Sequence, residues 1–180
     1  MLFVTDESRG NMGPGGAGSV IIRVHVLSRA AKILWVASLA MGAPHLTTVE
    51  IAYRGHICGL RRAKRGGLAP SHIVGADEMV ITQLRMRRSP KKPQLSALYR
   101  EASSILSDVD VVSWAHHCRG YNQMATTAVA VAVDTGKSTY GFNHDSSSLC
   151  CSGHDGLHRD VTFWYDLRFV EENTVQPITH

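Results

Sequence analysis

Short runs of apolar and β-branched residues mark the first 40 positions of the chain. Three of these runs, at residues 2–5, 19–26 and 33–40, have the length of β-strands. The segment between the first two runs contains five glycines and one proline, which suits a wide turn whose backbone reaches positive φ. A polar segment separates the second run from the third. The pattern therefore predicts a three-stranded antiparallel meander.

Helical spacing follows over residues 49–65, where Ile51, Ile57 and Leu60 recur among polar residues. Hydroxyl side chains precede this segment, and basic residues followed by glycine end it, as is typical of helix caps. Beyond it, strand-like runs and helix signals alternate. The pattern predicts a strand at 71–75, a helix at 77–88 capped by Asp77 and stopped before Pro90, a helix at 94–107, a strand at 109–115 and a helix at 119–134.

The last third of the chain gives weaker signals. Residues 119–134 are rich in Ala and Val, and we assign a helix because the run is too long for one strand. Residues 141–153 are rich in serine and predict a linker. Residues 161–170 alternate like a half-buried strand, but apolar positions at 157, 161, 164 and 167 would also form a helical stripe. Strand and helix both remain open there.

Composition narrows the class of protein. A chain of 180 residues with 44% hydrophobic residues can bury a full core, so one domain plus an appendage is expected. The net charge of +4 fits a nucleic-acid partner without requiring one. The four cysteines lack the spacing of a disulfide framework, and neither a signal peptide nor a membrane-spanning run is present. We expect an intracellular protein, cytoplasmic or nuclear, with no membrane partner.

Several motifs identify a family. Residues 8–18 read Ser-Arg-Gly-Asn-Met-Gly-Pro-Gly-Gly-Ala-Gly, and residues 74–84 read Val-Gly-Ala-Asp-Glu-Met-Val-Ile-Thr-Gln-Leu. With residues 53–64, 87–100 and 112–125, they resemble, in the same order and spacing, ribonuclease H domains of the form found in retroelements. The resemblance covers roughly residues 1–136 and leaves residues 137–180 as a linker and C-terminal appendage. It also favours a retroelement polyprotein as the origin of the chain.

The resemblance implies both the fold and a chemistry. The fold is α/β and ribonuclease H-like: a five-stranded mixed sheet, beginning with three antiparallel strands, flanked by helices on both faces. The chemistry needs four carboxylates around two Mg²⁺ ions, one activating water and the other stabilising the leaving oxygen. Alignment on the motifs places the four acid positions on Thr5, Ala52, Ala76 and Thr126. Because none of these is an acid, the resemblance predicts that the catalytic acids are lost.

Neighbouring residues are the fallback candidates. Asp6 follows Thr5, but side chains alternate across a strand, so it would take the opposite face. Glu50 lies two residues before position 52, about 200° around a helix. Asp77 is the most forgiving substitute, although a helix N-cap is its simpler role. His116 occupies the place of a mobile family histidine that assists product release, and a plain surface residue is the equal alternative.

Two clusters of basic residues and a His/Cys-rich segment complete the candidates. The first cluster is Arg61, Arg62, Lys64 and Arg65, and the second is Arg85, Arg87, Arg88, Lys91 and Lys92. Either could be a solvated face, but the resemblance places the second in the region with which the family grips the DNA strand of a hybrid. The residues to which we assign nucleic-acid binding are Arg9, Asn11, Thr48, Arg87, Arg88, Lys91, Lys92 and Asn122. A zinc site is disfavoured because no pair of ligands has a partner pair at standard spacing. The residues that suggest zinc are His144, Asp145, Cys150, Cys151, His154 and His158.

Three functions follow as hypotheses. The first is a catalytically inactive ribonuclease H-like domain, without a cofactor, that binds an RNA–DNA hybrid or duplex through basic loops or acts as a scaffold. The second is an active hybrid endoribonuclease that uses Mg²⁺ and shifted carboxylates. The third is a protein-binding subunit of a larger assembly, with the C-terminal appendage meeting the partner. The retained basic clusters favour the first hypothesis over the third, and the missing acids count against the second.

Overall fold

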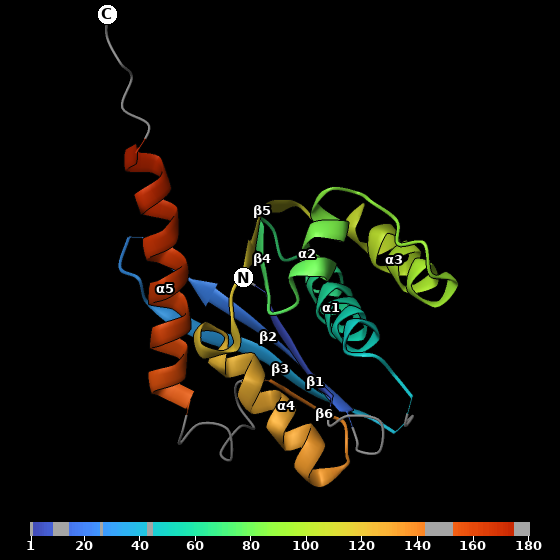
Figure 1. The fold of residues 1–180 in the computed structure, drawn as a ribbon. Coiled ribbons are helices and arrows are strands. Elements are labelled where there is room, and N and C mark those ends of the chain that lie inside the picture. Colours follow the sequence, from blue (N-terminus) through green and yellow to red (C-terminus); the bar gives the residue numbers. More distant parts are fainter. Residues whose placement is uncertain (1, 9–14, 26, 43–44, 143–152, 175–180) are drawn as a thin grey trace, which may run out of the picture.

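The structure, a computed structural model, describes residues 2–8, 15–25, 27–42, 45–142 and 153–174 (Figure 1). Its centre is a six-stranded sheet in the order β5-β4-β1-β2-β3-β6. The strands are β1 (Leu2–Ser8), β2 (Gly15–Val24), β3 (Ala31–Met41), β4 (Ser71–Gly75), β5 (Val111–His116) and β6 (Thr139–Phe142). The first three form the predicted antiparallel meander, and β4 and β5 add to it in parallel.

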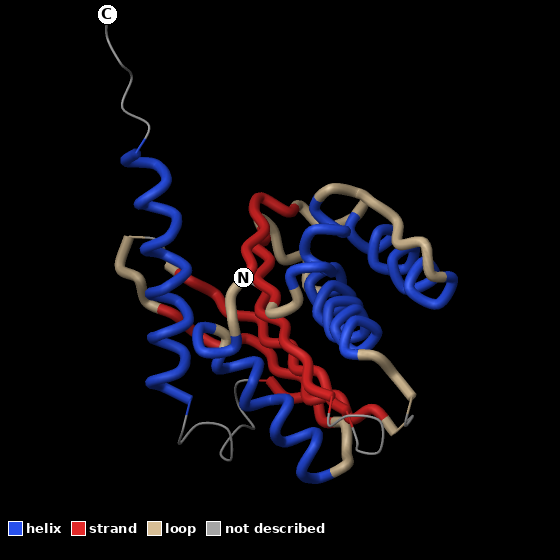
Figure 2. The backbone as a smooth tube through the Cα atoms, in the orientation of Figure 1, coloured by secondary structure: helices blue, strands red, loops and turns tan. Residues whose placement is uncertain are grey.

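Helices cover both faces of this sheet (Figure 2). They are α1 (Thr48–Arg65), α2 (Glu78–Arg85), α3 (Pro93–Leu106), α4 (Gln123–Thr135) and α5 (Gly153–Thr174). Helix α1 packs on one face with α2 and α3 beside it, and α4 packs on the other with α5 beside it. The expected α/β architecture, a mixed sheet that begins with three antiparallel strands and has helices on both faces, is therefore confirmed, although the sheet has six strands instead of the five expected.

Strand β2 shows why its sequence lacks a clean alternation. Ala17 and Ile21 lie in the core beneath α1, whereas Val20 and Ile22 lie in the core beneath α4. A strand buried on both faces is apolar at successive positions. The approach of α4 is close enough that a Cβ on Gly18 would lie 2.1 Å from a backbone oxygen of α4, so only glycine fits there.

Several element boundaries differ from the predictions for identifiable reasons. The second helix ends at Arg85 instead of 88, because Arg87 adopts φ = 52°. The last predicted helix begins at Gln123 instead of 119, since a short 3₁₀ turn occupies Arg119–Tyr121. Asp77 caps α2 as expected, with its Oδ1 accepting from the Val80 amide at 2.9 Å.

The C-terminal part adds two elements that the sequence did not settle. The open choice at 161–170 resolves as helix, since this segment lies within α5. Strand β6 pairs antiparallel with β3 and was not predicted. The predicted linker falls largely on residues 143–152, which lie outside the described residues. In the described part of the chain, no helix has the length and apolar character needed to cross a membrane.

Candidate functional site

Two of the four family acid positions meet at the junction of β1 and β4. The parallel pairing of these strands runs from Leu2 with Ile73 to Val4 with Gly75. Thr5 and Ala76 each follow the last of these pairs, so their backbones are neighbours just beyond the paired segment. The carboxyl ends of parallel strands are where α/β sheets commonly place ligand sites. The structure thus brings together the two positions that the motif alignment assigned to different parts of the sequence.

Helices α1 and α4 carry the other two positions on opposite faces of the sheet. Ala52 lies in the first turns of α1 and is 2% exposed within the core. Thr126 lies in the first turn of α4, where its hydroxyl donates to the Asn122 carbonyl at 2.9 Å. Its oxygen is therefore engaged in the helix backbone. The four positions together supply two hydroxyls and two methyl groups, which do not fit a pair of Mg²⁺ ions.

The acids nearest to these positions serve as helix caps. Glu50 completes a capping box with Thr47: its Oε2 accepts from the Thr47 amide and hydroxyl, both at 2.8 Å, and the Thr47 hydroxyl accepts from the Glu50 amide at 3.3 Å. Asp77 caps α2 and contributes, after burial and Tyr99, to raising the pKa of Tyr53. Both carboxylates thus have structural roles that keep them at helix ends.

Asp6, the remaining fallback acid, is placed by the backbone register of β1. It pairs with Ala17 of β2, whereas Thr5 pairs with Gly18. Ala17 belongs to the core beneath α1, and Gly18 faces α4. Directly paired residues share a face of the sheet, so Asp6 and Thr5 occupy opposite faces at this point. In the described part of the chain, no three His, Cys, Asp or Glu side chains are grouped so that they could hold a metal ion.

His116 lies beside Ala76, the third of the aligned acid positions. Its Nε2 is 3.2 Å from the carbonyl oxygen of Ala76, to which it can donate, and the residue is exposed at the end of β5. The next residue, His117, is buried and donates its amide to the Gly75 carbonyl at 3.0 Å. Pairing between β4 and β5 therefore holds the exposed imidazole over the end of β4.

One carboxylate at the site was missed by the sequence reasoning. Asp160 of α5 is fully buried, and its two oxygens accept from the amides of Gln123 at 2.8 Å and Met124 at 2.9 Å. It caps the amino end of α4 from another helix. Burial raises the pKa of Asp160, and the two backbone donors oppose this shift. Only the tertiary contact could reveal this role, since 36 residues separate Asp160 from Met124.

The basic loop between α2 and α3, residues 86–92, has a backbone conformation and a placement of charges that its residues do not favour. Arg87 takes φ = 52° at the position that usually holds glycine, while the Arg88 amide donates to the Gln83 carbonyl at 2.9 Å. Lys91 and Lys92 immediately precede α3, whose amino end has no side-chain cap. Like Arg87 and Arg88, both lysines are exposed and form no ion pair within the described chain. Positive side chains beside a helix amino end oppose the helix dipole, so the loop favours a bound anion.

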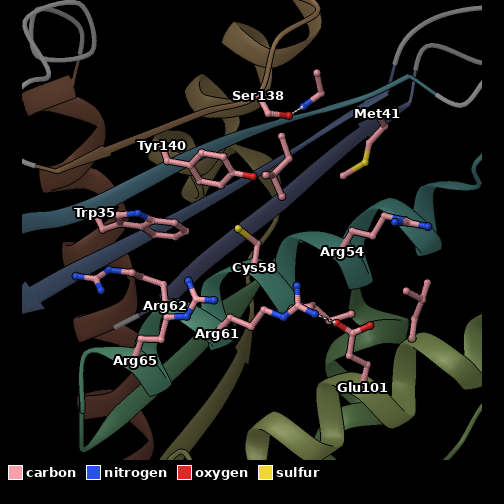
Figure 3. Close-up of a pocket in the computed structure, with 14 residues that line it drawn as sticks. Trp35, Met41, Arg54, Cys58, Arg61, Arg62, Arg65, Glu101, Ser138 and Tyr140 are labelled. Carbon is pink, nitrogen blue, oxygen red and sulfur yellow. Dashed lines mark hydrogen bonds and ion pairs between the residues drawn. The ribbon is translucent and has the colours of Figure 1, made fainter.

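The other basic cluster, on α1, is partly neutralised. Arg61 forms an ion pair with Glu101 at 2.5 Å (Figure 3). Lys64 forms another with Asp108 at 2.6 Å. Both acids belong to α3 or the turn after it, so these pairs link α1 to α3. Exposed pairs of this kind are worth about 0–1 kcal/mol each. The two basic clusters therefore differ, because only the loop keeps all its charges unpaired among the described residues.

The remaining predicted contacts are dispersed. Thr48 is exposed at the start of α1, and Asn122 is fully buried before α4. Arg9 and Asn11 lie outside the described residues. Of the candidates for zinc, His144, Asp145, Cys150 and Cys151 also lie outside them.

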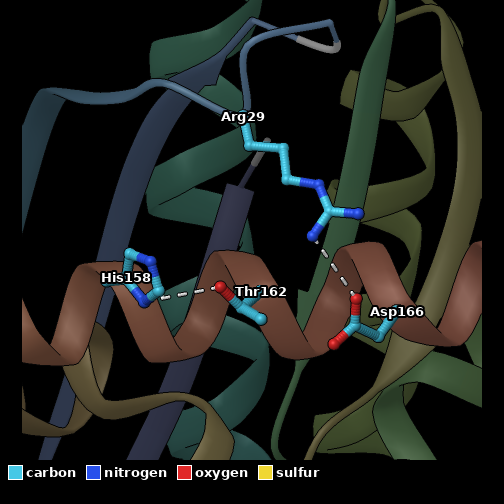
Figure 4. Close-up of polar contacts among 4 residues, drawn as sticks. All are labelled: Arg29, His158, Thr162 and Asp166. Carbon is cyan, nitrogen blue, oxygen red and sulfur yellow. Dashed lines mark hydrogen bonds and ion pairs between the residues drawn. The ribbon is translucent and has the colours of Figure 1, made fainter.

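His158 is exposed on α5, with its Nδ1 3.5 Å from the Thr162 hydroxyl (Figure 4). One turn further along α5, Asp166 pairs with Arg29 of the β2–β3 turn at 3.8 Å. Arg29 also lies over the Tyr165 ring, 4.1 Å from its centroid. These contacts fasten α5 to the sheet.

Comparison with known proteins agrees with this fold. Residues 7–132 match the family described as reverse transcriptase-like. Over 142 residues the chain is 26% identical to the bifunctional protein Rv2228c of Mycobacterium tuberculosis, a match that covers 79% of this chain and 37% of that one. The same identity and coverage hold for an uncharacterised protein of Mycobacterium bovis. The chain thus spans little more than a third of the length of these curated relatives.

Solved structures give a similar result. The N-terminal RNase H domain of Rv2228c from Mycobacterium tuberculosis, solved as a fusion with maltose binding protein, superposes with a TM-score of 0.66 at 27% identity, over 74% of this chain and 92% of that chain. RNase H1 from Halobacterium salinarum gives 0.64 at 24% identity, over 74% and 96%. LC11-RNase H1, solved in complex with an RNA/DNA hybrid, gives 0.64 at 23% identity, over 75% and 96%. The last two show the fold alone.

Proposed function

Because the chain belongs to the reverse transcriptase-like family and shares its ribonuclease H-like fold, we propose that it binds RNA–DNA hybrid or duplex through the basic α2–α3 loop and does not cleave it. The observation that carries the proposal is that no carboxylate stands at the four aligned acid positions and that two neighbouring carboxylates cap helices. The four family positions hold Thr5, Ala52, Ala76 and Thr126, and the acids Glu50 and Asp77 cap helices. Two-metal catalysis depends on several anions that hold two cations beside the scissile phosphate.

The loop supports the binding half of the proposal. Arg87, Arg88, Lys91 and Lys92 are exposed, without ion pairs in the described chain, and two of them adjoin the uncapped amino end of α3. A left-handed backbone at a non-glycine residue costs about 1 kcal/mol or more. The left-handed backbone and the positive charges beside a helix amino end both oppose stability. A phosphate ligand would explain them, because the arginines and the helix amino end would both attract it.

Cleavage is tested with a labelled RNA–DNA hybrid in millimolar Mg²⁺ or Mn²⁺. The unmodified chain is expected to leave the hybrid intact. The quadruple variant Thr5→Asp, Ala52→Glu, Ala76→Asp and Thr126→Asp tests whether the alignment is right, with circular dichroism as the check on folding. Cleavage by the unmodified chain that is lost in Asp77→Asn would overturn the proposal in favour of the shifted-carboxylate nuclease.

Binding is measured separately, by fluorescence anisotropy of the hybrid across a salt series. Affinity should fall with salt, with a slope of about 0.9 for each phosphate contacted, as counterions are released. Charge reversal of Arg87, Arg88, Lys91 and Lys92 should weaken binding and flatten that slope. The matched control reverses four exposed basic residues that lie outside the loop, Arg23, Lys32, Lys137 and Arg159. Equal binding by the loop variant and the control would reject the loop as the interface.

A single substitution separates charge from geometry in the loop. Arg87→Gly removes one positive charge and suits the left-handed backbone at φ = 52°. It should raise the free energy of unfolding by about 1 kcal/mol while weakening hybrid binding. Arg88→Gln removes a charge at the next position without that backbone gain, so it should weaken binding alone. If Arg87→Gly leaves hybrid affinity unchanged, Arg87 does not contact the ligand.

A further inference from the structure

A second basic surface lies between α1 and the edge of the sheet formed by β3 and β6 (Figure 3). It is a groove of about 730 Å³, within the size range of ligand sites in proteins. Arginines of α1 line one wall, and Trp35 of β3 and Tyr140 of β6 line the other. The groove does not include the α2–α3 loop, and no residue of the four family acid positions lines it.

Strand β6 builds this groove. It pairs with the outer edge of β3, with Tyr140 opposite Ala37, and the Ala40 amide donates to the Ser138 hydroxyl at 3.0 Å where β6 begins. Ala37 is buried in the core beneath α1, so Tyr140 stands on the same face of the sheet as α1. Helix α1 lies mainly over β1 and β2, which leaves the ledge formed by β3 and β6 beside it. Strand β6 lies beyond residues 7–132, the segment that matches the family, whereas β3 lies within it.

The charged wall follows one stripe of α1. Arg54, Arg61 and Arg65 are spaced by seven and four residues, which places them on one side of the helix over about 16 Å of its axis. Arg61 is paired with Glu101, the one acid in the lining. Arg54 and Arg65 are exposed and form no ion pair within the described part of the chain. An anionic polymer could contact both ends of this stripe.

The aromatic wall presents a supported ring. Tyr140 is 62% exposed and stacks on Trp35, which is 5% exposed, with ring centroids 6.5 Å apart and planes inclined by 27°. The buried indole therefore holds a ring whose surface is mostly open to solvent. Cys58, at the base of the groove, carries no negative charge at neutral pH, because burial raises the pKa of its thiol to about 11. The groove thus combines positive charge with an exposed aromatic platform.

We propose that this groove binds a single-stranded segment of nucleic acid, with its phosphates on Arg54 and Arg65 and a base stacked on Tyr140. Basic grooves with aromatic platforms bind single strands because every unpaired base offers a flat face. A duplex hides these faces, so the exposed ring selects against it. The site goes beyond hybrid binding by the α2–α3 loop and does not depend on it. A strand leaving the duplex held at the loop is one way in which both sites could act on one molecule.

The test is fluorescence anisotropy of a labelled 12-nucleotide thymidine strand at 50 mM salt, with the full chain. Tyr140→Ala should weaken binding about tenfold, and Tyr140→Phe, which keeps the ring, should not. Charge reversal of Arg54 and Arg65 should weaken binding and reduce the salt slope by about 1.4, at about 0.7 per phosphate for single strands. Reversal of Lys32 and Arg159 is the matched control and should change the slope much less. The loop variant should keep its affinity for the single strand.

Each alternative occupant gives a different result. If the groove instead binds an acidic protein segment, poly-glutamate of equal charge should displace the labelled strand as well as an unlabelled thymidine strand does. This outcome would overturn the proposal. Unchanged affinity in Tyr140→Ala would also overturn it. Ultraviolet crosslinking should yield an adduct on the peptide that contains Tyr140, whereas an adduct confined to residues 86–92 would assign the strand to the loop. That last result would leave the proposed function intact and reject only this site.

Discussion

The amino ends of α1 and α4 carry two of the four family positions, Ala52 and Thr126, but the two ends are capped differently. At α1, Thr47 and Glu50 form a reciprocal cap from residues three apart in sequence. At α4, Asn122 gives no side-chain cap, and the cap comes from Asp160 of α5. The first helix start is therefore specified locally, whereas the second depends on the docking of a distant helix. The two helices that carry these positions are thus capped by different means, one local and one tertiary.

The sharpest way to break this comparison is Asp160→Ala. The buried amides of Gln123 and Met124 would lose their hydrogen-bond acceptor, so we expect the free energy of unfolding to fall by about 3 kcal/mol. The measurement is urea unfolding followed by circular dichroism at pH 7. Asp166→Ala on the same helix is the control, since its exposed pair with Arg29 should be worth less than about 1 kcal/mol. Equal losses in the two variants would show that Asp160 does not cap α4.

The second prediction concerns pH and the buried face of α1. Burial lowers the pKa of His56 from 6.5 to about 4, and its side chain is 1% exposed. Above pH 6.5 the imidazole is neutral in both states, so its contribution is fully present. As pH falls from 6.5 to 4, only the unfolded chain gains the proton, and stability falls by about 3 kcal/mol from this group.

Urea unfolding at pH 7, 5.5 and 4 measures this loss. In His56→Gln, the free energy of unfolding should fall less between pH 7 and pH 4 than in the unmodified chain, by about the loss expected from His56. His72 offers a comparison near α5, because burial, and then Arg168, also lower its pKa to about 4. Its Nδ1 lies 2.5 Å from the Arg168 guanidinium, so protonation of His72 would place two positive groups together. Parallel pH curves for His56→Gln and the unmodified chain would contradict the assignment of His56.

The smallest effect is expected at the local cap of α1. Thr47→Ala removes the oxygen that accepts from the Glu50 amide and should cost about 1 kcal/mol in urea unfolding. Adding Glu50→Ala should cost less than the sum of the separate losses, because the two residues act as one capping box. Thr48→Ala, next to the cap, is the control. A loss at Thr47 as large as that at Asp160 would erase the distinction between the two helix starts.

Much of the fold was predictable because its signals are local. The meander of β1, β2 and β3 followed from glycine-rich and polar turns between apolar runs, and α1 and α2 followed from their caps. The motif alignment also selected Thr5 and Ala76, which in the structure each follow the last residue of the parallel pairing between β1 and β4. Glu50 and Asp77, the acids next to the aligned positions 52 and 76, cap helices α1 and α2.

The elements and boundaries that were not predicted depend on contacts with residues far away in the sequence. Strand β6 is four residues long and forms only because the free edge of β3 accepts it. Helix α4 begins at Gln123, after the 3₁₀ turn at Arg119–Tyr121, and Asp160 caps this start from α5. The segment at 161–170 fitted both strand and helix periods, and packing of Trp164 and Val161 against the core beneath α4 suits the helix.

The sequence by itself determined the family, the order of the core elements and the absence of acids at Thr5, Ala52, Ala76 and Thr126, because each is written in adjacent residues or in motif spacing. The tertiary structure decided how the surviving polar groups are used. It directed Asp160 to a helix end and brought Tyr140 beside the arginines of α1. Such contacts join residues 36 or more positions apart, and their energy comes from burial and geometry that no local pattern records.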